Sequence, residues 1–196
     1  EVIAPDLQEG ALVLDTAPSK ATVAAWAKEL LPPGRYYIGL TPAINPDYLH
    51  GTEIGVRAAR ADLFERGLMV VDAPMGTPES AFNFAMGFVT LLGAVPLLMD
   101  TAEADGIFAS MHFLPQLTAA ALLEATVDKP GWQEARKLAG RPYASVTSGL
   151  GYHDDIASLR DSVLENRENV VRLLNSVLTS LIQLRDEIED QDRDAL

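Results

Sequence analysis

The amino-acid sequence predicts an α/β fold over residues 1–100, followed by an all-α region over residues 101–196. In the first region, short apolar runs alternate with stretches of helical spacing, which is typical of a sheet layered with helices. Two of the runs, ALVLD and LMVVD, are almost continuously apolar, as in parallel strands that are covered on both faces. After Asp100 no strand-like run follows, and apolar residues recur three and four positions apart.

The elements of the first region alternate along the chain. We expect strands at 11–15, 36–40, 68–72 and 95–99, and helices at 20–31, 53–66 and 78–92. Thr77 as N-cap and Pro78 at the first helical position mark the start of the third helix. Because strands that alternate with helices are usually joined by right-handed crossovers, the sequence predicts a parallel sheet.

The second region is predicted to be helical throughout. We expect one long helix over 102–127 that Pro115 kinks, a helix over 132–138, and helices over 154–164 and 165–190. The last carries an apolar stripe that needs a cover, and packing within the chain and a dimer partner both remain open. Its length favours a homodimer. The stripe consists of Val170, Leu174, Val177, Leu181, Leu184 and Ile188.

Charge and composition exclude several classes of partner. The net charge of −13 disfavours nucleic acid and anionic membrane surfaces, which need a basic face. The longest apolar run, 84–99, is shorter than the roughly 20 residues of a membrane span. The absence of cysteine fits a cytoplasmic chain and excludes thiolate chemistry. The N-terminus has no signal-peptide pattern and no initiating Met, so we expect a processed or excised piece.

The sequence holds no G-x-G-x-x-G turn, the fingerprint with which a dinucleotide-binding fold begins. This absence has two alternative explanations. Either the first half of such a domain has been removed, or the protein never bound a dinucleotide in that way.

Residues 36–64, YYIGLTPAINPDYLHGTEIGVRAARADLF, carry the main resemblance to a known family. The segment resembles the His-Pro-Met-x-Gly … Gly … Ala … Leu-Phe segment of prephenate/arogenate dehydrogenases, with Ile38, Gly39 and Pro42 in place. Other segments match in the same order over nearly the whole chain, through Asp15, Lys20, Gly55, Ala59, Leu63, Phe64, Asp105, Ala109, Leu114, Pro115 and Asn166.

The resemblance implies a fold and an activity. Residues 1–100 would be a partial Rossmann-like parallel sheet without its N-terminal G-x-G-x-x-G half, and residues 101–196 a helical substrate and dimerisation domain. It also implies NAD or NADP, hydride transfer with decarboxylation of a small-molecule substrate, tyrosine biosynthesis, and a homodimer through the C-terminal helices. The implied cofactor-binding residues are Asp15, Thr16, Ser19 and Pro42, and the implied substrate-binding residues are Thr52, Tyr143, Ser148 and Arg141.

The positions at which the family does chemistry differ here. Thr41 stands at the first family histidine, which polarises the substrate hydroxyl, and threonine cannot act as a general base near neutral pH. Phe113 stands at the second histidine, and His112 precedes it by a step of about 100° around a helix. Pro18 replaces the supporting serine. Ser148 replaces the arginine that binds the substrate carboxylate.

His112, His50 and Thr41 are therefore the catalytic candidates. The alternatives are a packed histidine at a helix seam for His112 and an exposed loop histidine for His50. The hydroxyls of Tyr143–Ser148 either line a polar pocket or cap helices. No histidine pair has metal-ligand spacing, so no metal is expected.

Two functions are compatible with these observations. The first is an oxidoreductase of the prephenate dehydrogenase type, or one with a shifted substrate. The second is a non-catalytic homologue that serves as a dimerising small-molecule-binding or regulatory module. Whether the chain is an enzyme stays open at this point.

Overall fold

The structure is a computed structural model that describes residues 3–51, 53, 55–152 and 156–196. The chain forms two compact units, one ending at Asp105 and the other beginning at Gly106. Each unit has a hydrophobic core of its own.

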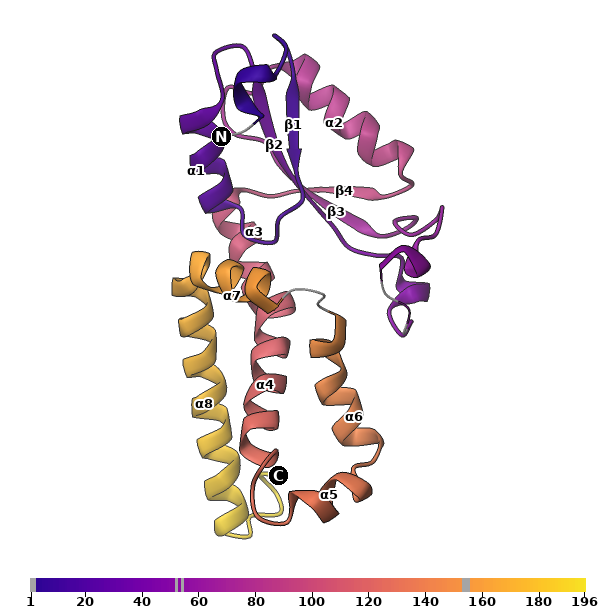
Figure 1. The fold of residues 1–196 in the computed structure, drawn as a ribbon. Coiled ribbons are helices and arrows are strands. Elements are labelled where there is room, and N and C mark those ends of the chain that lie inside the picture. The colour runs from indigo at the N-terminus through magenta and orange to yellow at the C-terminus, as the bar shows by residue number, and fades with distance from the viewer. Residues whose placement is uncertain (1–2, 52, 54, 153–155) are drawn as a thin grey trace. The chain divides into compact units, whose positions relative to one another are not determined.

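A four-stranded sheet forms the centre of the first unit, as predicted. Its strands are β1 (Leu12–Asp15), β2 (Tyr36–Pro42), β3 (Leu68–Asp72) and β4 (Val95–Leu98), in the order β1-β2-β3-β4 (Figure 1). β1 pairs with β2 and β3 with β4 in parallel. The sheet is thus mostly parallel.

The central pair departs from the parallel prediction, because β2 and β3 are antiparallel and Pro42 pairs with Met69. A parallel return needs a crossover, usually an α-helix, that carries the chain back across the sheet. In its described residues, the segment that joins these two strands contains the short 3-10 helices η2 (Pro46–Tyr48) and η3 (Gly55–Ala58) with turns and no α-helix, so the chain re-enters the sheet at the edge where it left it.

The predicted helix over 53–66 is therefore wrong. Side-chain hydrogen bonds hold this loop instead: the Asn45 amide donates to the Asp62 carbonyl at 3.2 Å, and the Tyr48 hydroxyl donates to the Asp62 carboxylate at 2.9 Å. Arg66 adopts a left-handed φ of 63° and its N–H donates to the Gly93 carbonyl. These long-range bonds outweigh the helix propensity of an Ala/Arg-rich stretch, which is a weak preference.

Helices α1 (Ala21–Leu30) and α2 (Glu79–Leu91) flank the sheet (Figure 1). α2 begins one residue later than predicted, and it buries Ala81, Ala85 and Val89, spaced four residues apart, in the core. The core of this unit consists of Ile38, Leu40, Met69, Val71, Ala85, Val89 and Ala94. The apolar runs of β2 and β3 thus supply the buried strand residues of this core, whereas Val95 and Leu98 of β4 are 50% and 59% exposed.

One helical run leads out of the first unit. It consists of α3 (Thr101–Phe108), a π-helical segment η4 (Ala109–Phe113) and α4 (Leu114–Thr126). Pro115 lies in the first turn of α4, where a missing N–H costs little, so the irregularity is a widened turn before the proline rather than a kink at it.

The remaining described elements are helical, and three of their four α-helices were predicted. They are α5 (Trp132–Leu138), α6 (Arg141–Thr147), α7 (Ile156–Glu165) and α8 (Arg167–Glu189), with the 3-10 turns η1 (Ala4–Asp6) and η5 (Ser148–Tyr152). α6 was not expected as a helix. The predicted start of α7 at Asp154 lies outside the described residues.

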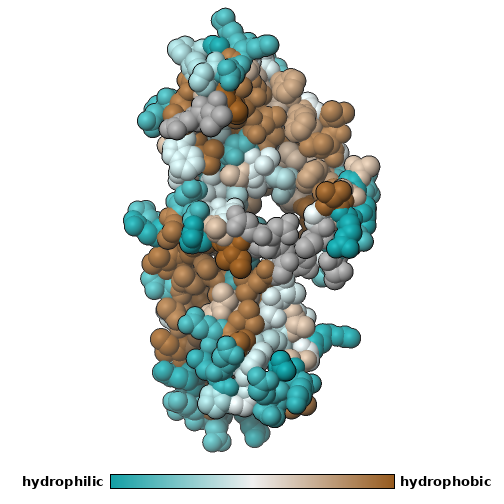
Figure 2. Space-filling view, in the orientation of Figure 1, coloured by the Kyte–Doolittle hydropathy of each residue, from teal (hydrophilic) through white to brown (hydrophobic). Residues whose placement is uncertain are grey.

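The core of the second unit is small and leaves much of α8 uncovered. Ala109, Phe113 and Val170 are buried together, with Leu117, Leu159, Val163, Leu173 and Leu174 packed against them. Leu181 and Ile188 are 56% and 61% exposed. Apolar side chains gather over the α7 and α8 region in Figure 2.

By length and composition, the run Thr101–Thr126 is the one helix among the described residues that passes as a membrane span. Core helices of soluble proteins pass the same measure, so this is weak evidence for a membrane.

Candidate functional site

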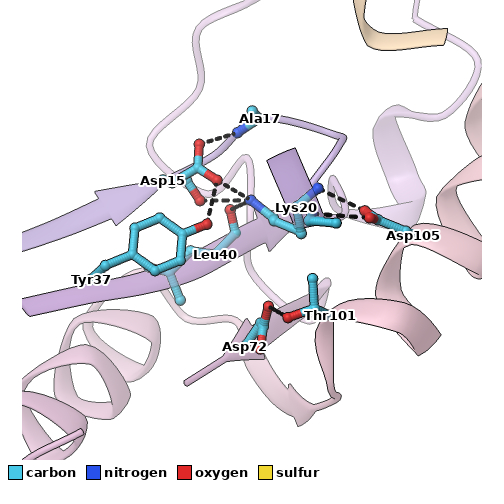
Figure 3. Close-up of polar contacts among 9 residues, drawn as sticks. Asp15, Ala17, Lys20, Tyr37, Leu40, Asp72, Thr101 and Asp105 are labelled. Atoms are coloured by element: carbon cyan, nitrogen blue, oxygen red, sulfur yellow. Dashed lines mark hydrogen bonds and ion pairs between the residues drawn. The ribbon is translucent and has the colours of Figure 1, made fainter. Parts of the chain in front are cut away.

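Three charged residues that match the family motifs meet in the first unit (Figure 3). Asp15 ends β1, Lys20 precedes α1, and Asp105 lies on α3. The Lys20 ammonium lies 3.0 Å from Asp15 Oδ2, and the Lys20 backbone N–H donates to Asp105 Oδ1 at 2.6 Å. Residues that are far apart in sequence thus form one buried polar network.

Lys20 is the centre of this network, with a side chain that is 0% exposed. Its ammonium donates to the Asp15 carbonyl at 2.8 Å and to the Leu40 carbonyl at 3.3 Å, besides the Asp15 carboxylate. Burial lowers the pKa of Lys20, and the nearby Asp15 carboxylate opposes this effect. All three donors of the ammonium are engaged, which favours a charged structural clamp between the carboxyl ends of β1 and β2.

The Asp15 carboxylate receives further donors. The Tyr37 hydroxyl donates to Oδ2 at 3.0 Å, and the Ala17 N–H donates to Oδ1 at 2.8 Å. Burial first, and the Asp15 charge second, raise the pKa of Tyr37 far above its ordinary value. Tyr37 therefore stays protonated and serves as a donor to Asp15.

Asp105 caps the start of α1 from another element. Besides the Lys20 N–H, its carboxylate accepts the Ala21 N–H at 3.0 Å. A carboxylate at a helix N-terminus satisfies orphan donors and complements the positive end of the helix dipole. Asp105 thereby fixes the position of the turn that carries Ser19 and Lys20.

A second buried carboxylate, Asp72, ends β3. The Thr101 hydroxyl donates to its Oδ2 at 2.7 Å. Burial raises the pKa of Asp72, and the bond from Thr101 opposes that shift. Asp72 and Thr101 lie beside the Lys20 network in Figure 3.

Two buried hydroxyls at the predicted site lack hydrogen-bond partners within the described part of the chain. They are Thr41 Oγ1, one residue after the carbonyl that Lys20 holds, and Ser19 Oγ, one residue before Lys20. A buried hydroxyl without a partner is costly. Both therefore have unused hydrogen-bonding capacity at positions that were predicted for catalysis and for cofactor binding.

The other predicted cofactor residues are more open. Thr16 is exposed just after β1, and Pro42 is half-buried at the end of β2. Asp15 is engaged by Lys20, Tyr37 and Ala17, so it acts through the network rather than as a free carboxylate.

The histidine candidates occupy different settings. His50 is exposed on the loop after η2. His112 lies half-buried in the π-helical segment, and its ring meets the fully buried Phe113 ring edge-on with centroids 5.3 Å apart. A π-helical turn changes the helical register, which is the kind of change that His112 would need to take the place of the following residue.

The predicted substrate residues that are described belong to the second unit. Tyr143 lies on α6 and its hydroxyl is 2.8 Å from Thr126 Oγ1. Arg141 and Ser148 are exposed, and the Ser148 hydroxyl, at the start of η5, donates to the Ser145 carbonyl of α6. Thr52 lies outside the described residues.

Sequence reasoning missed Tyr37, Asp72 and Thr101, and did not select Lys20 as a site residue. Lys20 carried a signal, since it matches a family motif position. Tyr37, Asp72 and Thr101 carried none, because strand periodicity does not show which polar side chains share a buried contact. No group of three or more metal-ligating side chains lies together among the described residues.

The residues present fit one part of a dinucleotide. β1 and β2 are parallel, so Thr16, Thr41 and Pro42 stand at one carboxyl edge, where open α/β sheets bind ligands. The orphan hydroxyls of Ser19 and Thr41 suit the polar groups of a ribose or a carboxamide. The pyrophosphate would need the glycine-rich turn that this sequence lacks.

Comparison with known proteins points to the same family as the motifs. No family model matches the chain. The chain is 30% identical over 136 residues to "Probable prephenate dehydrogenase NovF" of Streptomyces niveus, which covers 65% of this chain and 36% of NovF. The chain thus spans little more than a third of that relative.

Solved structures show the same fold. Prephenate dehydrogenase of Aquifex aeolicus, in complex with hydroxyphenyl propionate and NAD+, matches 99% of this chain and 65% of its own with a TM-score of 0.83 and 23% identity. Synechocystis arogenate dehydrogenase matches 100% of this chain and 68% of its own, with a TM-score of 0.77 and 23% identity. The predicted resemblance is confirmed: this chain is similar to prephenate and arogenate dehydrogenases in sequence and shares their fold.

Proposed function

We propose that this chain is the C-terminal part of a cytoplasmic NAD(P)-dependent oxidoreductase of the prephenate/arogenate dehydrogenase type. The observation that carries the proposal is the buried Asp15–Lys20–Asp105 network at the carboxyl edge of the sheet. Burying an ammonium group is costly even when all its hydrogens are donated in hydrogen bonds. We therefore take the buried Lys20 as a sign that the arrangement it holds is needed. The network holds the turn with Ser19 and the strand end with Thr41, which are the positions nearest to chemistry in the family.

The free edge of the sheet supports a longer protein. Among the described residues β1 pairs with β2 alone, so its second edge is open. An exposed strand edge is a template for further pairing. An upstream strand with a glycine-rich turn would extend the sheet at that edge and supply the missing phosphate site.

Thr41 determines what this chain can contribute to the proposed reaction. NAD(P)+, when bound, accepts a hydride from the substrate. Thr41 can hydrogen-bond to a substrate hydroxyl but cannot take its proton near neutral pH. Oxidation of a hydroxyl group releases a proton together with the hydride, and without a protein base at Thr41 that proton passes to water. A substrate that can release its proton to water suits this site better than one that needs a protein base, which favours a shifted substrate within the type.

A specific observation favours the second candidate, a non-catalytic homologue. Phe113 is fully buried in the core of the second unit, so the position of the second family histidine is used for packing. With Thr41 at the first position, neither histidine is replaced by a group of similar pKa. Such a protein would bind a small molecule without turning it over.

Cofactor titration of the longer protein, with its upstream sequence restored, separates these functions. We expect NADH or NADPH to bind, measured by fluorescence quenching. Absence of binding at millimolar cofactor would contradict the dehydrogenase proposal. Binding with turnover of prephenate or arogenate would support it directly, whereas binding with turnover of neither would point to a shifted substrate or to the non-catalytic homologue.

Restoring the histidine then distinguishes those last two. Thr41→His is expected to raise prephenate or arogenate oxidation at least tenfold, and to introduce a pH dependence near the histidine pKa of about 6.5. Thr90→His, at an exposed position of α2, is the matched control and should change neither. If Thr41→His folds and binds cofactor but stays inactive, the site has lost more than its base and the non-catalytic homologue is favoured.

A further inference from the structure

The second unit contains a cavity that the dehydrogenase proposal does not use. Its volume is about 680 Å³, and it lies between the end of α4, the helix α5 and the start of α6. Small-molecule sites usually measure about 300–1,000 Å³ and are apolar with a few placed polar groups. The size of this cavity fits a small ligand.

The chain bends sharply to form this cavity. Asp128 and Gly131 both adopt left-handed backbone conformations, with φ of 56° and 86°, in the turn that ends α4 and begins α5. Gly140 then separates α5 from α6. The three helices therefore border a cavity that is open to solvent, where Leu138 is 84% exposed, instead of running on as one rod.

Two aromatic rings line the cavity. The Trp132 and Tyr143 rings have centroids 6.3 Å apart and are tilted by 44°. The other lining residues include Ala135, Ala139 and Pro142, and none of the lining side chains is charged. Such walls favour a planar, uncharged ligand over an ionic one.

One pair of hydroxyl groups in the cavity can orient a bound ligand. Thr126 and Tyr143 both line it, and their hydroxyl oxygens are 2.8 Å apart. The Thr126 hydroxyl donates to the Leu122 carbonyl at 2.7 Å, so its hydrogen is already used. Tyr143 must then donate to Thr126, which leaves the Tyr143 oxygen as an acceptor. Within the described part of the chain no second bond uses that acceptor.

We infer that this cavity is a binding site for a small, neutral aromatic molecule that carries one hydrogen-bond donor. The ring packs against the Trp132 and Tyr143 rings, and the donor bonds to the Tyr143 oxygen. A charged aromatic acid is disfavoured because the walls offer no counter-ion.

Phenol and anisole form the test pair, since they share a ring and differ in the donor. We expect phenol to shift the Trp132 indole N–H signal of the ¹⁵N-labelled 196-residue chain, and anisole to bind about fivefold more weakly, the factor for one neutral hydrogen bond. Trp26, on α1, is the internal reference because it lies outside the cavity. Equal binding of both probes, or equal shifts of both tryptophans, would overturn the inference.

Two variants complete the test. Tyr143→Phe keeps the ring and removes the acceptor, so the affinity for phenol should fall to that for anisole. Ala135→Trp, at an exposed helix position, should fill the cavity and abolish the binding of both phenol and anisole. The rest of the amide spectrum should stay unchanged. Retained phenol binding in Ala135→Trp contradicts the site. A shift from dimer to monomer in that variant by light scattering would show that a second copy, rather than a small molecule, occupies the cavity.

Discussion

At the scale of single residues, the Lys20 ammonium shows how a buried charge is maintained. Its three hydrogens are donated to Asp15 and Leu40 oxygens, and Tyr37 and Ala17 donate to the same Asp15 carboxylate. Each donor thus meets an acceptor away from water. The free energy of unfolding should depend on every member of the set.

Tyr37→Phe removes one donor from Asp15. We expect the free energy of unfolding to fall by about 1.5–3 kcal/mol, the range for hydrogen bonds to charged groups, in urea titrations at pH 7. Tyr36→Phe, one residue earlier in β2, is the control and should cost less. Equal losses in the two variants would mean that the Tyr37 hydroxyl contributes nothing beyond ring packing.

We also expect the stability difference between the parent chain and Tyr37→Phe to depend on pH. The folded-state pKa of Tyr37 is raised above the ordinary value of 10.0, so its contribution to stability is full below pH 10 and is lost as the pH rises above it. The stability difference between the parent chain and Tyr37→Phe should therefore shrink above pH 10. A difference that stays constant from pH 8 to pH 11 would contradict the raised pKa.

For Asp72 we expect the substitution to increase stability at neutral pH, whereas the substitution of Tyr37 decreases it. Because burial raises its folded-state pKa above 3.8, the ionised form costs stability at neutral pH, and this cost is absent below pH 3.8. Asp72→Asn, which still accepts from Thr101, should raise the thermal midpoint at pH 7 and lose that advantage near pH 3. A lower midpoint at pH 7 would show that attraction to Lys20 outweighs the burial.

At the scale of elements, α1 owes its start to a residue 84 positions away. The Asp105 carboxylate on α3 accepts the N–H groups of Lys20 and Ala21. No local side chain caps this helix. The helix itself was predictable from its spacing, but its cap was not, because a cap supplied from another element leaves no local pattern.

Asp105→Ala should cost about 2 kcal/mol of unfolding free energy, because it leaves the buried Lys20 N–H and the partly buried Ala21 N–H at a helix N-terminus without their acceptor. Asp100→Ala is the matched control: Asp100 accepts the Glu103 N–H in an exposed cap, so water can replace it and the loss should be smaller. The comparison uses urea unfolding monitored by circular dichroism. A smaller loss for Asp105→Ala than for Asp100→Ala would refute the capping role.

The loop between β2 and β3 shows where element prediction failed. Its Ala/Arg-rich composition predicted a helix, yet Asn45, Tyr48, Asp62 and Arg66 bond across the loop. Such bonds join positions about 14–21 residues apart, beyond the reach of a helical pattern. Because no crossover helix forms, β3 also runs antiparallel to β2.

At the scale of the whole molecule, the exposed stripe of α8 predicts association. Leu181 and Ile188 of this stripe are more than half exposed, as is Leu178 outside it, and the small core of the second unit leaves them uncovered. Contiguous apolar surface of this kind usually marks an interface. We expect a homodimer through α8.

Leu181→Lys should convert that dimer to a monomer at micromolar concentration, measured by light scattering. Thr179→Lys is the control, since two residues correspond to about 200° around a helix and place it on another face. A monomeric parent chain, or dissociation by both variants alike, would exclude an interface specific to the stripe.

The sequence by itself determined the four strands, most helices, the change from α/β to all-α, and the likeness to prephenate and arogenate dehydrogenases. These features follow from local periodicity and from short motifs, which can be recognised in a sequence without knowledge of tertiary contacts. The tertiary structure alone decided that Asp15, Lys20 and Asp105 meet, that the Thr41 and Ser19 hydroxyls have no hydrogen-bond partner among the described residues, and that Tyr143 bonds to Thr126. Those facts depend on which distant side chains share a buried space, and burial makes each unmet hydrogen bond costly enough to determine the arrangement.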